Sequence, residues 1–292
     1  MEFYEYMAIE LNKQTNCPVI GISHTGHHFN FDHAASTTRH HQRRRQHRWN
    51  HRINVVEQIN HKVQFLEKHL FLDEDLTAMN YDENNTDIVF IGHSIGCFII
   101  LEILEALNKN MKNQVRKAIL LFPTIERMSV TPNGKRLTFL TTFFMWLLNF
   151  FALLASLLPD SIRKMGINIG FTRPHSSKQL VTNANETVDE MLKSFSCMRS
   201  CLFMGKNEMN FVKNPNTNAI ERHLDLLLFY YGKTDNWCPI DYYYDMEGFL
   251  SKLNIENKKQ HLVLDEHGMD HAFCLYRDQC SQISNMIQRW ID

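Results

Sequence analysis

Short, continuous apolar runs alternate along this chain with longer stretches in which apolar residues recur every three or four positions. The short runs predict five buried strands, at 17–23, 87–91, 117–122, 226–231 and 261–264. The longer stretches predict five helices, at 3–11, 55–72, 95–107, 241–253 and 273–291. Apolar strands separated by amphipathic helices are typical of a mostly parallel sheet covered by helices. The pattern therefore predicts an α/β fold, in which reactive groups lie at the carboxyl ends of the strands.

The stretch Leu137–Leu158 interrupts this alternation with 22 residues that carry no charge. That length is enough to cross a bilayer as one helix. However, the stretch lies between two strands of one predicted sheet, so a spanning helix would divide the domain across the membrane. We therefore expect an apolar cap lying in a lipid surface, or a hairpin that dips into it; the alternative is an apolar lid packed on the domain. The side chains expected at the lipid surface are Phe143, Phe144, Trp146, Leu147, Phe150 and Phe151.

Length and composition favour a single domain over residues 1–292, with 129–215 as its cap. The net charge of −1 gives no reason to expect nucleic-acid binding. The chain has seven cysteines, an odd number, and they lack the paired C-x-x-C spacing of a zinc site. This predicts free thiols in a reducing compartment. The first residues carry glutamates and no long apolar core, so we expect no secretory signal and a cytoplasm-facing location.

A second interruption, Arg39–Arg52, is rich in arginine and histidine and has no apolar periodicity. Histidines bind metal ions, but a tract without carboxylate or cysteine partners at a fixed spacing is more often a solvated loop. We expect a loop here and no metal site. The arginines at 43–45 leave contact with anionic lipid head groups as an alternative, and contact with nucleic acid as a weaker one.

The main chemical signal is the pentapeptide Gly92-His93-Ser94-Ile95-Gly96, between a predicted strand and a predicted helix. In a nucleophile elbow, a strained strand-to-helix turn exposes the serine hydroxyl, and a glycine two residues away on each side leaves room for the backbone. This motif predicts Ser94 as a nucleophile and aims the backbone N–H of Ile95 at a developing oxyanion. The alternative is a tight turn whose serine only caps the helix.

A serine nucleophile needs a base to take its proton and an acid to orient that base, and in this architecture the chain order is serine, acid, histidine. Asp235 is the candidate acid, because it follows the predicted strand 226–231 at its carboxyl end. Asp225 begins that strand and would lie at the opposite edge, while Asp241 and Asp245 fall in the next predicted helix. An aspartate in a turn is by itself more often structural, so the assignment depends on three roles occurring in order.

His271 is the candidate base, because it stands just before the final predicted helix, where this architecture places the base. His267, four residues earlier, is the second choice. His93 is a weaker candidate, since its side chain should point away from Ser94. Acyl transfer by these groups uses no cofactor, and we expect none.

Four segments resemble the lipid droplet-associated hydrolase family of α/β-hydrolase proteins, namely 91–96, 121–128, 229–239 and 271–273. The similarity runs through most of the chain, and the second segment is more specific than the elbow. It implies an α/β-hydrolase fold and a serine lipid hydrolase with Ser94, Asp235 and His271 in the triad positions. It also implies that the apolar segment engages a lipid droplet monolayer or endoplasmic reticulum surface, and that the substrate is a neutral-lipid ester such as a sterol ester, in lipid storage and turnover.

The chain departs from the family pattern at its start. Family members carry further strands and a Pro-Gly-Asn-Pro-Gly loop before the helix that begins here near Phe3, and that loop supplies a second oxyanion N–H. We therefore expect an N-terminally incomplete domain in which Ile95 is the remaining donor, with turnover lowered by about 100- to 1000-fold. The alternative function is a weakly catalytic or non-catalytic droplet-surface protein with a vestigial triad.

Overall fold

A parallel sheet lies at the centre of the computed structural model, which describes residues 2–27, 52–71, 87–107, 109–171, 180, 184–255 and 257–291. The strands lie side by side in chain order: β1 (Ile88–His93), β2 (Val115–Leu121), β3 (Leu227–Tyr231) and β4 (Leu262–Leu264). His93 is paired with Leu121, and Leu121 with Tyr230, so the carboxyl ends of these strands meet at one edge. The predicted α/β fold with a parallel sheet is confirmed.

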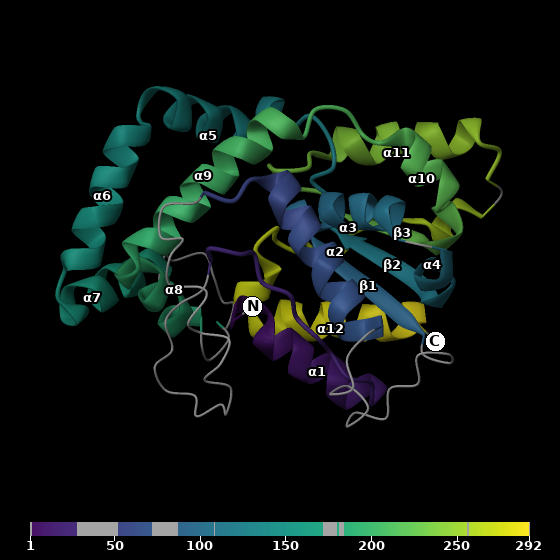
Figure 1. The fold of residues 1–292 in the computed structure, drawn as a ribbon, viewed down its shortest axis with the longest axis horizontal. Helices are drawn as coiled ribbons and strands as arrows, with labels where there is room; N and C mark the ends of the chain where they lie inside the picture. The colour runs from purple at the N-terminus through teal and green to yellow at the C-terminus, as the bar shows by residue number, and fades with distance from the viewer. Residues whose placement is uncertain are drawn as a thin grey trace.

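Helices cover both faces of the sheet (Figure 1). One face carries α2 (Val55–Phe71), α3 (Ile95–Ala106) and α11 (Ile240–Lys252), with the short α10 (Thr217–Arg222) against α3. The other face carries α1 (Glu5–Thr15) and α12 (Arg277–Ile291), and Trp290 of α12 packs on Tyr230 with ring centroids 5.7 Å apart. Helix α3 is buried on most sides, as expected of a helix between the sheet and an outer helix. A short helix, α4 (Lys109–Gln114), leads into β2.

The range 129–215, predicted as a cap, extends beyond the left side of the sheet in Figure 1. Its described part contains α5 (Pro132–Phe143), α6 (Met145–Leu157), α7 (Asp160–Phe171), α8 (Ala184–Lys193) and α9 (Phe195–Phe211). Helices α5 and α6 meet at Phe144 with a bend of 91°. Among the described residues, no single helix is long and apolar enough to cross a bilayer. Helices α5 and α6, taken together across their bend, are long and apolar enough by length and composition alone.

The prediction of a strand at 17–23 was wrong. The segment forms no ladder with β1, Val19 and Ile20 are exposed, and Pro18 lacks a backbone N–H to donate. An apolar run becomes a strand only where a neighbouring strand accepts its backbone hydrogen bonds.

Three further predictions are changed or lie outside the structure. The final helix begins at Arg277 rather than at 273, because Phe273–Leu275 forms a 3-10 turn, η7. Strand β2 ends at Leu121, because Phe122 has φ +50° and leaves the extended region. The predicted loop 39–52 lies outside the described residues, except for Arg52.

Candidate active site

Ser94 occupies the turn between β1 and α3 with φ +54°, a conformation that non-glycine residues seldom adopt. Its backbone N–H donates to the Leu121 carbonyl at 3.0 Å, which ties the turn to β2. A Cβ on Gly92 would lie 3.0 Å from the backbone of Gly96 and Cys97, as well as 2.7 Å from Cδ1 of Ile100, so this position favours glycine. A Cβ on Gly96 would meet nothing within 4 Å, so the crowding expected there was wrong. The elbow is therefore strained at its serine and crowded on its strand side only.

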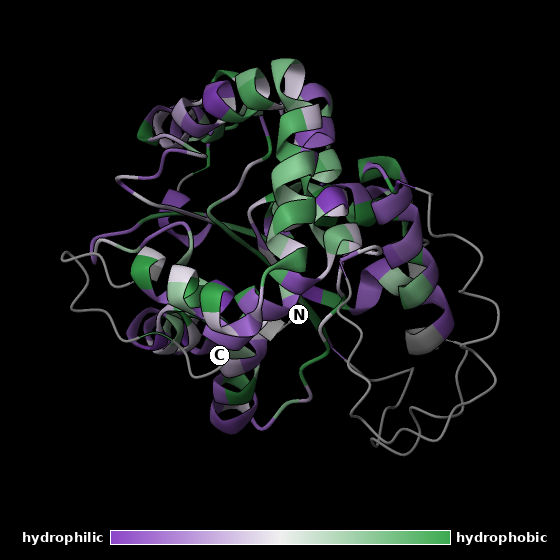
Figure 2. Cartoon of the chain, turned by 90° about the vertical axis from the view of Figure 1, so that its left-hand side faces the viewer, coloured by the Kyte–Doolittle hydropathy of each residue, from purple (hydrophilic) through white to green (hydrophobic). Residues whose placement is uncertain are grey.

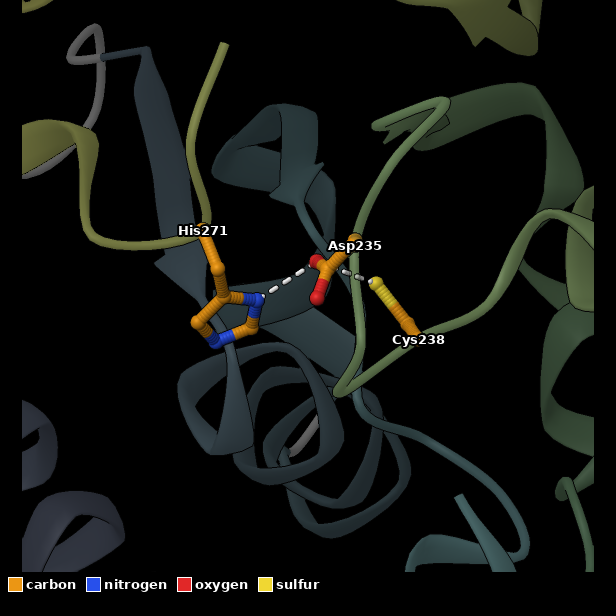
Figure 3. Close-up of side chains that lie close together, drawn as sticks. All are labelled: Asp235, Cys238 and His271. Carbon is orange, nitrogen blue, oxygen red and sulfur yellow. Dashed lines mark hydrogen bonds and ion pairs between the residues drawn. The ribbon is translucent and has the colours of Figure 1, made fainter. Parts of the chain in front are cut away.

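The Ser94 hydroxyl does not cap α3, which removes the alternative of a purely capping serine. Instead, its Oγ lies 3.0 Å from Nε2 of His271, in the loop between β4 and η7. Nδ1 of His271 lies 2.6 Å from Oδ2 of Asp235, in the turn after β3 (Figure 3). The structure thus brings the three predicted side chains together from separate strand ends into one chain of hydrogen bonds.

The protons in this chain can be assigned from the hydrogen-bond partners. An ionised Asp235 only accepts hydrogen bonds, so Nδ1 of His271 carries the proton that bridges them. In the neutral imidazole, Nε2 then presents a lone pair to the Ser94 hydroxyl, which donates to it. This is the arrangement in which a histidine can accept the serine proton.

The Asp235 side chain is fully buried and holds three donors. Besides His271, the Trp237 backbone N–H donates to Oδ1 at 2.7 Å, and the Cys238 thiol donates to Oδ2 at 3.0 Å (Figure 3). Burial alone would raise the pKa of Asp235, but the hydrogen bonds and positive charge from His271, with the donors Cys238 and Trp237, outweigh it and lower the pKa. The acid is therefore held as a carboxylate.

The ligand atoms of Asp235, Cys238 and His271 lie within 4.8 Å of one another, a grouping that would suit a metal ion by distance. Burial, and then the nearby Asp235 charge, raise the pKa of Cys238 well above its usual range. A metal binds the thiolate, whereas this protonated thiol donates to the carboxylate. The chemistry of these groups fits a hydrogen-bonded acid and base better than a metal centre.

His93 is hydrogen-bonded to Tyr4 and to the backbone of His271 rather than to Ser94. Its Nε2 lies 2.8 Å from the His271 carbonyl oxygen, which only accepts, so Nε2 carries a proton. Its Nδ1 therefore accepts from the Tyr4 hydroxyl, 2.5 Å away, in the 3-10 turn η1 (Glu2–Tyr4). Burial and repulsion by His271 lower the pKa of His93 to about 3, so the ring stays neutral. The N-terminal turn is thus tied to the backbone of the candidate base through His93.

Thr124 is a neighbour of Ser94 that the sequence did not predict. It is buried, and its hydroxyl lies 3.5 Å from Oγ of Ser94. It follows the end of β2 by three residues, and its position at the carboxyl end of a strand was the signal that pointed to it.

The rejected candidates lie away from this site. Asp225 is in the 3-10 turn Leu224–Leu226, which precedes β3. Asp245 pairs with Arg127 on the surface, and the His267 side chain is exposed.

Ile95, the predicted oxyanion donor, is the first residue of α3. The first N–H groups of a helix have no acceptor within the helix, so the Ile95 N–H is not used by the hydrogen bonds of α3.

Large apolar side chains are exposed on helices α5, α6 and α7 of the range 129–215. We call this the apolar face, made of exposed residues of three helices: Phe139, Leu140, Phe143, Trp146, Phe150, Phe151, Leu153, Leu154, Leu157, Ile162, Met165 and Ile169. Figure 2 turns this end toward the viewer, and hydrophobic colour covers most of the upright helix α6. Trp146 is 71% and Phe143 63% exposed, whereas Leu147 is half-buried. Leu147 is therefore the least accessible of the six side chains predicted to lie at the lipid surface. Soluble monomers rarely expose so many large apolar side chains together.

The parallel sheet, the strained serine turn and the hydrogen-bonded serine, histidine and aspartate define a protein of the α/β-hydrolase fold. A family model described as lipid-droplet associated hydrolase matches residues 1–274. The chain therefore belongs to the lipid droplet-associated hydrolase family, and the resemblance seen in its motifs is confirmed.

Relatives from several animals share this similarity. The chain is 33% identical over 236 residues to the lipid droplet-associated hydrolase of Rattus norvegicus, covering 80% of this chain and 63% of the relative. The Gallus gallus protein is 31% identical, with 80% and 64% covered, and the Drosophila melanogaster protein is 32% identical, with 78% and 66% covered. The chain thus spans less than two thirds of the length of these relatives.

Two solved esterases are similar in part. The esterase E22 L374D mutant aligns with a TM-score of 0.47 at 13% identity, covering 83% of this chain and 67% of that one. An esterase from Thermogutta terrifontis aligns with a TM-score of 0.39 at 15% identity, covering 75% and 70%.

Proposed function

We propose that this chain is a serine carboxylic ester hydrolase that acts on neutral-lipid esters, such as sterol esters, at the surface of lipid droplets or the endoplasmic reticulum. The observation that carries this proposal is the hydrogen-bond chain from Ser94 through His271 to Asp235, with distances of 3.0 and 2.6 Å. Family membership supports the class of reaction, and the apolar face supports the class of substrate.

In this reaction His271 takes the proton from Ser94 as the hydroxyl oxygen attacks the ester carbonyl. The tetrahedral oxyanion accepts a hydrogen bond from the backbone N–H of Ile95, at the positive end of α3. Collapse of this intermediate returns the proton from His271 to the leaving alcohol and leaves an acyl-serine, which water hydrolyses with His271 again acting as base. Asp235 keeps the imidazole in the tautomer that this sequence needs.

A fluorophosphonate probe tests the proposal directly. We expect the native chain to be labelled on the peptide that contains Ser94, located by mass spectrometry, and to release fatty acid from a cholesteryl oleate emulsion. A chain that floats with droplets but is neither labelled nor hydrolytic would support the alternative, a droplet-surface protein with a vestigial triad.

The apolar face gives a prediction about droplet binding. Changing Trp146, Phe150 and Phe151 together to serine is expected to weaken binding to phosphatidylcholine-coated triolein droplets by about 1000-fold or more, because each buried aromatic side chain contributes roughly 1.5–3 kcal/mol. Flotation with droplets measures it. The matched control changes Ile9, Val56 and Tyr244 to serine, three apolar side chains exposed outside the cap. Equal losses in the two variants would contradict the surface role of α6.

The link through His93 gives a second prediction. Tyr4→Phe removes the donor to Nδ1 of His93 and is expected to lower kcat for p-nitrophenyl butyrate by about tenfold with KM unchanged, because the His271 backbone loses part of its anchor. The control is Tyr6→Phe, whose hydroxyl contacts Ser281 and Arg277 rather than His93. A rise in KM without a change in kcat would argue against this role of Tyr4.

A further inference from the structure

A small cleft between α6 and α9 is not used by the proposed hydrolysis. Its volume is about 150 Å³, and its lining residues are Arg52, Met145, Asn149, Arg199, Phe203 and Lys206. Three of these six are cationic and none is acidic. A cleft with this charge has the composition of an anion site.

The three cations of the cleft have no carboxylate partner among the described residues, unlike Arg163 and Lys193 of the neighbouring helices α7 and α8. Arg163 pairs with Asp189 and Asp160, and Lys193 pairs with Asp189 and Glu190. Among the residues that the structure describes, Arg52, Arg199 and Lys206 form no ion pair with a carboxylate. An anion in the cleft would relieve the repulsion between these three like charges.

Neighbouring side chains prepare the cleft for a polar ligand. The Arg52 guanidinium lies over the Phe203 ring, 5.5 Å from its centroid, which restrains it at the rim. The amide of Asn149 donates to the Met145 carbonyl at 2.7 Å, while its Oδ1 is buried without a hydrogen-bond partner. The cleft therefore offers cationic donors together with one unsatisfied acceptor.

The cleft adjoins the apolar face. Met145 and Asn149, one helical turn apart, line the cleft, whereas Trp146 and Phe150, each one residue further on, are exposed on the apolar face. Because one residue turns an α-helix by about 100°, the cleft and the apolar face are adjacent strips of α6. When α6 lies in a monolayer, the cleft is positioned at the level of the lipid head groups.

We propose that this cleft binds the phosphate group of a phosphate-monoester lipid while the acyl chains of that lipid lie along the apolar face. A phosphate monoester carries about 1.5–2 negative charges near pH 7, which suits three cations better than the single charge of a fatty-acid carboxylate. The P–OH of the singly charged form donates to Oδ1 of Asn149, whereas the doubly charged form is held by the three cations alone. The proposal rests on the lipid-surface role given above, although not on hydrolysis.

Calorimetric titration of the whole chain with soluble dihexanoyl phosphatidic acid tests this proposal without a droplet and without turnover, so its outcome is independent of the flotation and hydrolysis experiments. We expect binding by the native chain that is about 100-fold weaker in Arg199→Gln/Lys206→Gln. The matched control, Lys135→Gln/Arg136→Gln, removes one lysine and one arginine from the exposed surface of α5 and is expected to bind as the native chain does. If the double variant shows no cooperative unfolding transition, and so is not folded, the single variant Arg199→Gln takes its place in the titration.

Two further ligands separate the possible sources of the anion. Inorganic phosphate is expected to bind at least about tenfold more weakly than dihexanoyl phosphatidic acid, and hexanoate more weakly still. Equal affinity for inorganic phosphate would overturn the lipid assignment, and equal affinity for hexanoate would overturn the choice of phosphate. Equal weakening in both double variants, or no binding of phosphatidic acid by the native chain, would overturn the site itself.

Discussion

His271→Ala is expected to lower kcat for ester hydrolysis by a factor on the order of 10⁶, the loss known when a triad histidine is removed from a serine hydrolase. Nε2 of His271 lies 3.0 Å from Oγ of Ser94, and among the described residues no other imidazole nitrogen is hydrogen-bonded to that oxygen. Without this base the hydroxyl keeps its proton and attacks poorly. Steady-state hydrolysis of p-nitrophenyl butyrate measures the effect, with thermal unfolding to show that the variant is folded.

The matched control is His267→Ala. This histidine belongs to the same loop but its side chain is exposed, so kcat is expected to stay within about twofold of the native value, as for most surface substitutions. The double variant Ser94→Ala/His271→Ala should lose no more than either single variant, because the two residues act as one unit. Additive losses would mean that Ser94 and His271 do not act on the same step.

Asp235→Asn is expected to lower kcat by about 10⁴-fold, because an amide in place of the carboxylate holds the wrong imidazole tautomer. The geometry should otherwise persist, since asparagine is nearly isosteric and its carbonyl oxygen can still accept from Trp237. Asp225→Asn is the control, because that residue lies before the opposite end of β3 and is expected to leave kcat unchanged. Equal activity of Asp235→Asn and the native chain would exclude Asp235 as the orienting acid.

The same residue predicts a pH dependence of stability. The folded-state pKa of Asp235 lies below its value in the unfolded chain, so folding favours the ionised form. The resulting stability is fully present above the unfolded pKa of about 3.9 and is lost as the pH falls through the lower folded value. The difference in melting temperature between the native chain and Asp235→Asn should therefore shrink below about pH 4, and a difference independent of pH would contradict the ionised state of Asp235.

Local sequence was enough to predict the core elements of this fold. The apolar runs at 87–91, 117–122, 226–231 and 261–264 all correspond to strands of the sheet, because the strands of a parallel sheet covered by helices carry apolar side chains on both faces. The equally apolar run at 17–23 did not, since hydrophobicity reports the tendency to be buried and says nothing about whether a partner strand is adjacent. The bend at Phe144 was likewise absent from the pattern, because the apolar stretch continues across it.

For the site, the sequence by itself determined Ser94, Asp235 and His271 as candidates, because the elbow motif and the order of strand ends are local features of the chain. Only the tertiary structure decided their hydrogen bonds, the link from Tyr4 through His93 to the His271 backbone, and the cleft that gathers Arg52, Arg199 and Lys206. Tyr4 and His93 are 89 residues apart, and His93 and His271 are 178 apart. Contacts over such separations depend on how whole helices and strands pack, and the periodicity of any one segment carries no record of that packing.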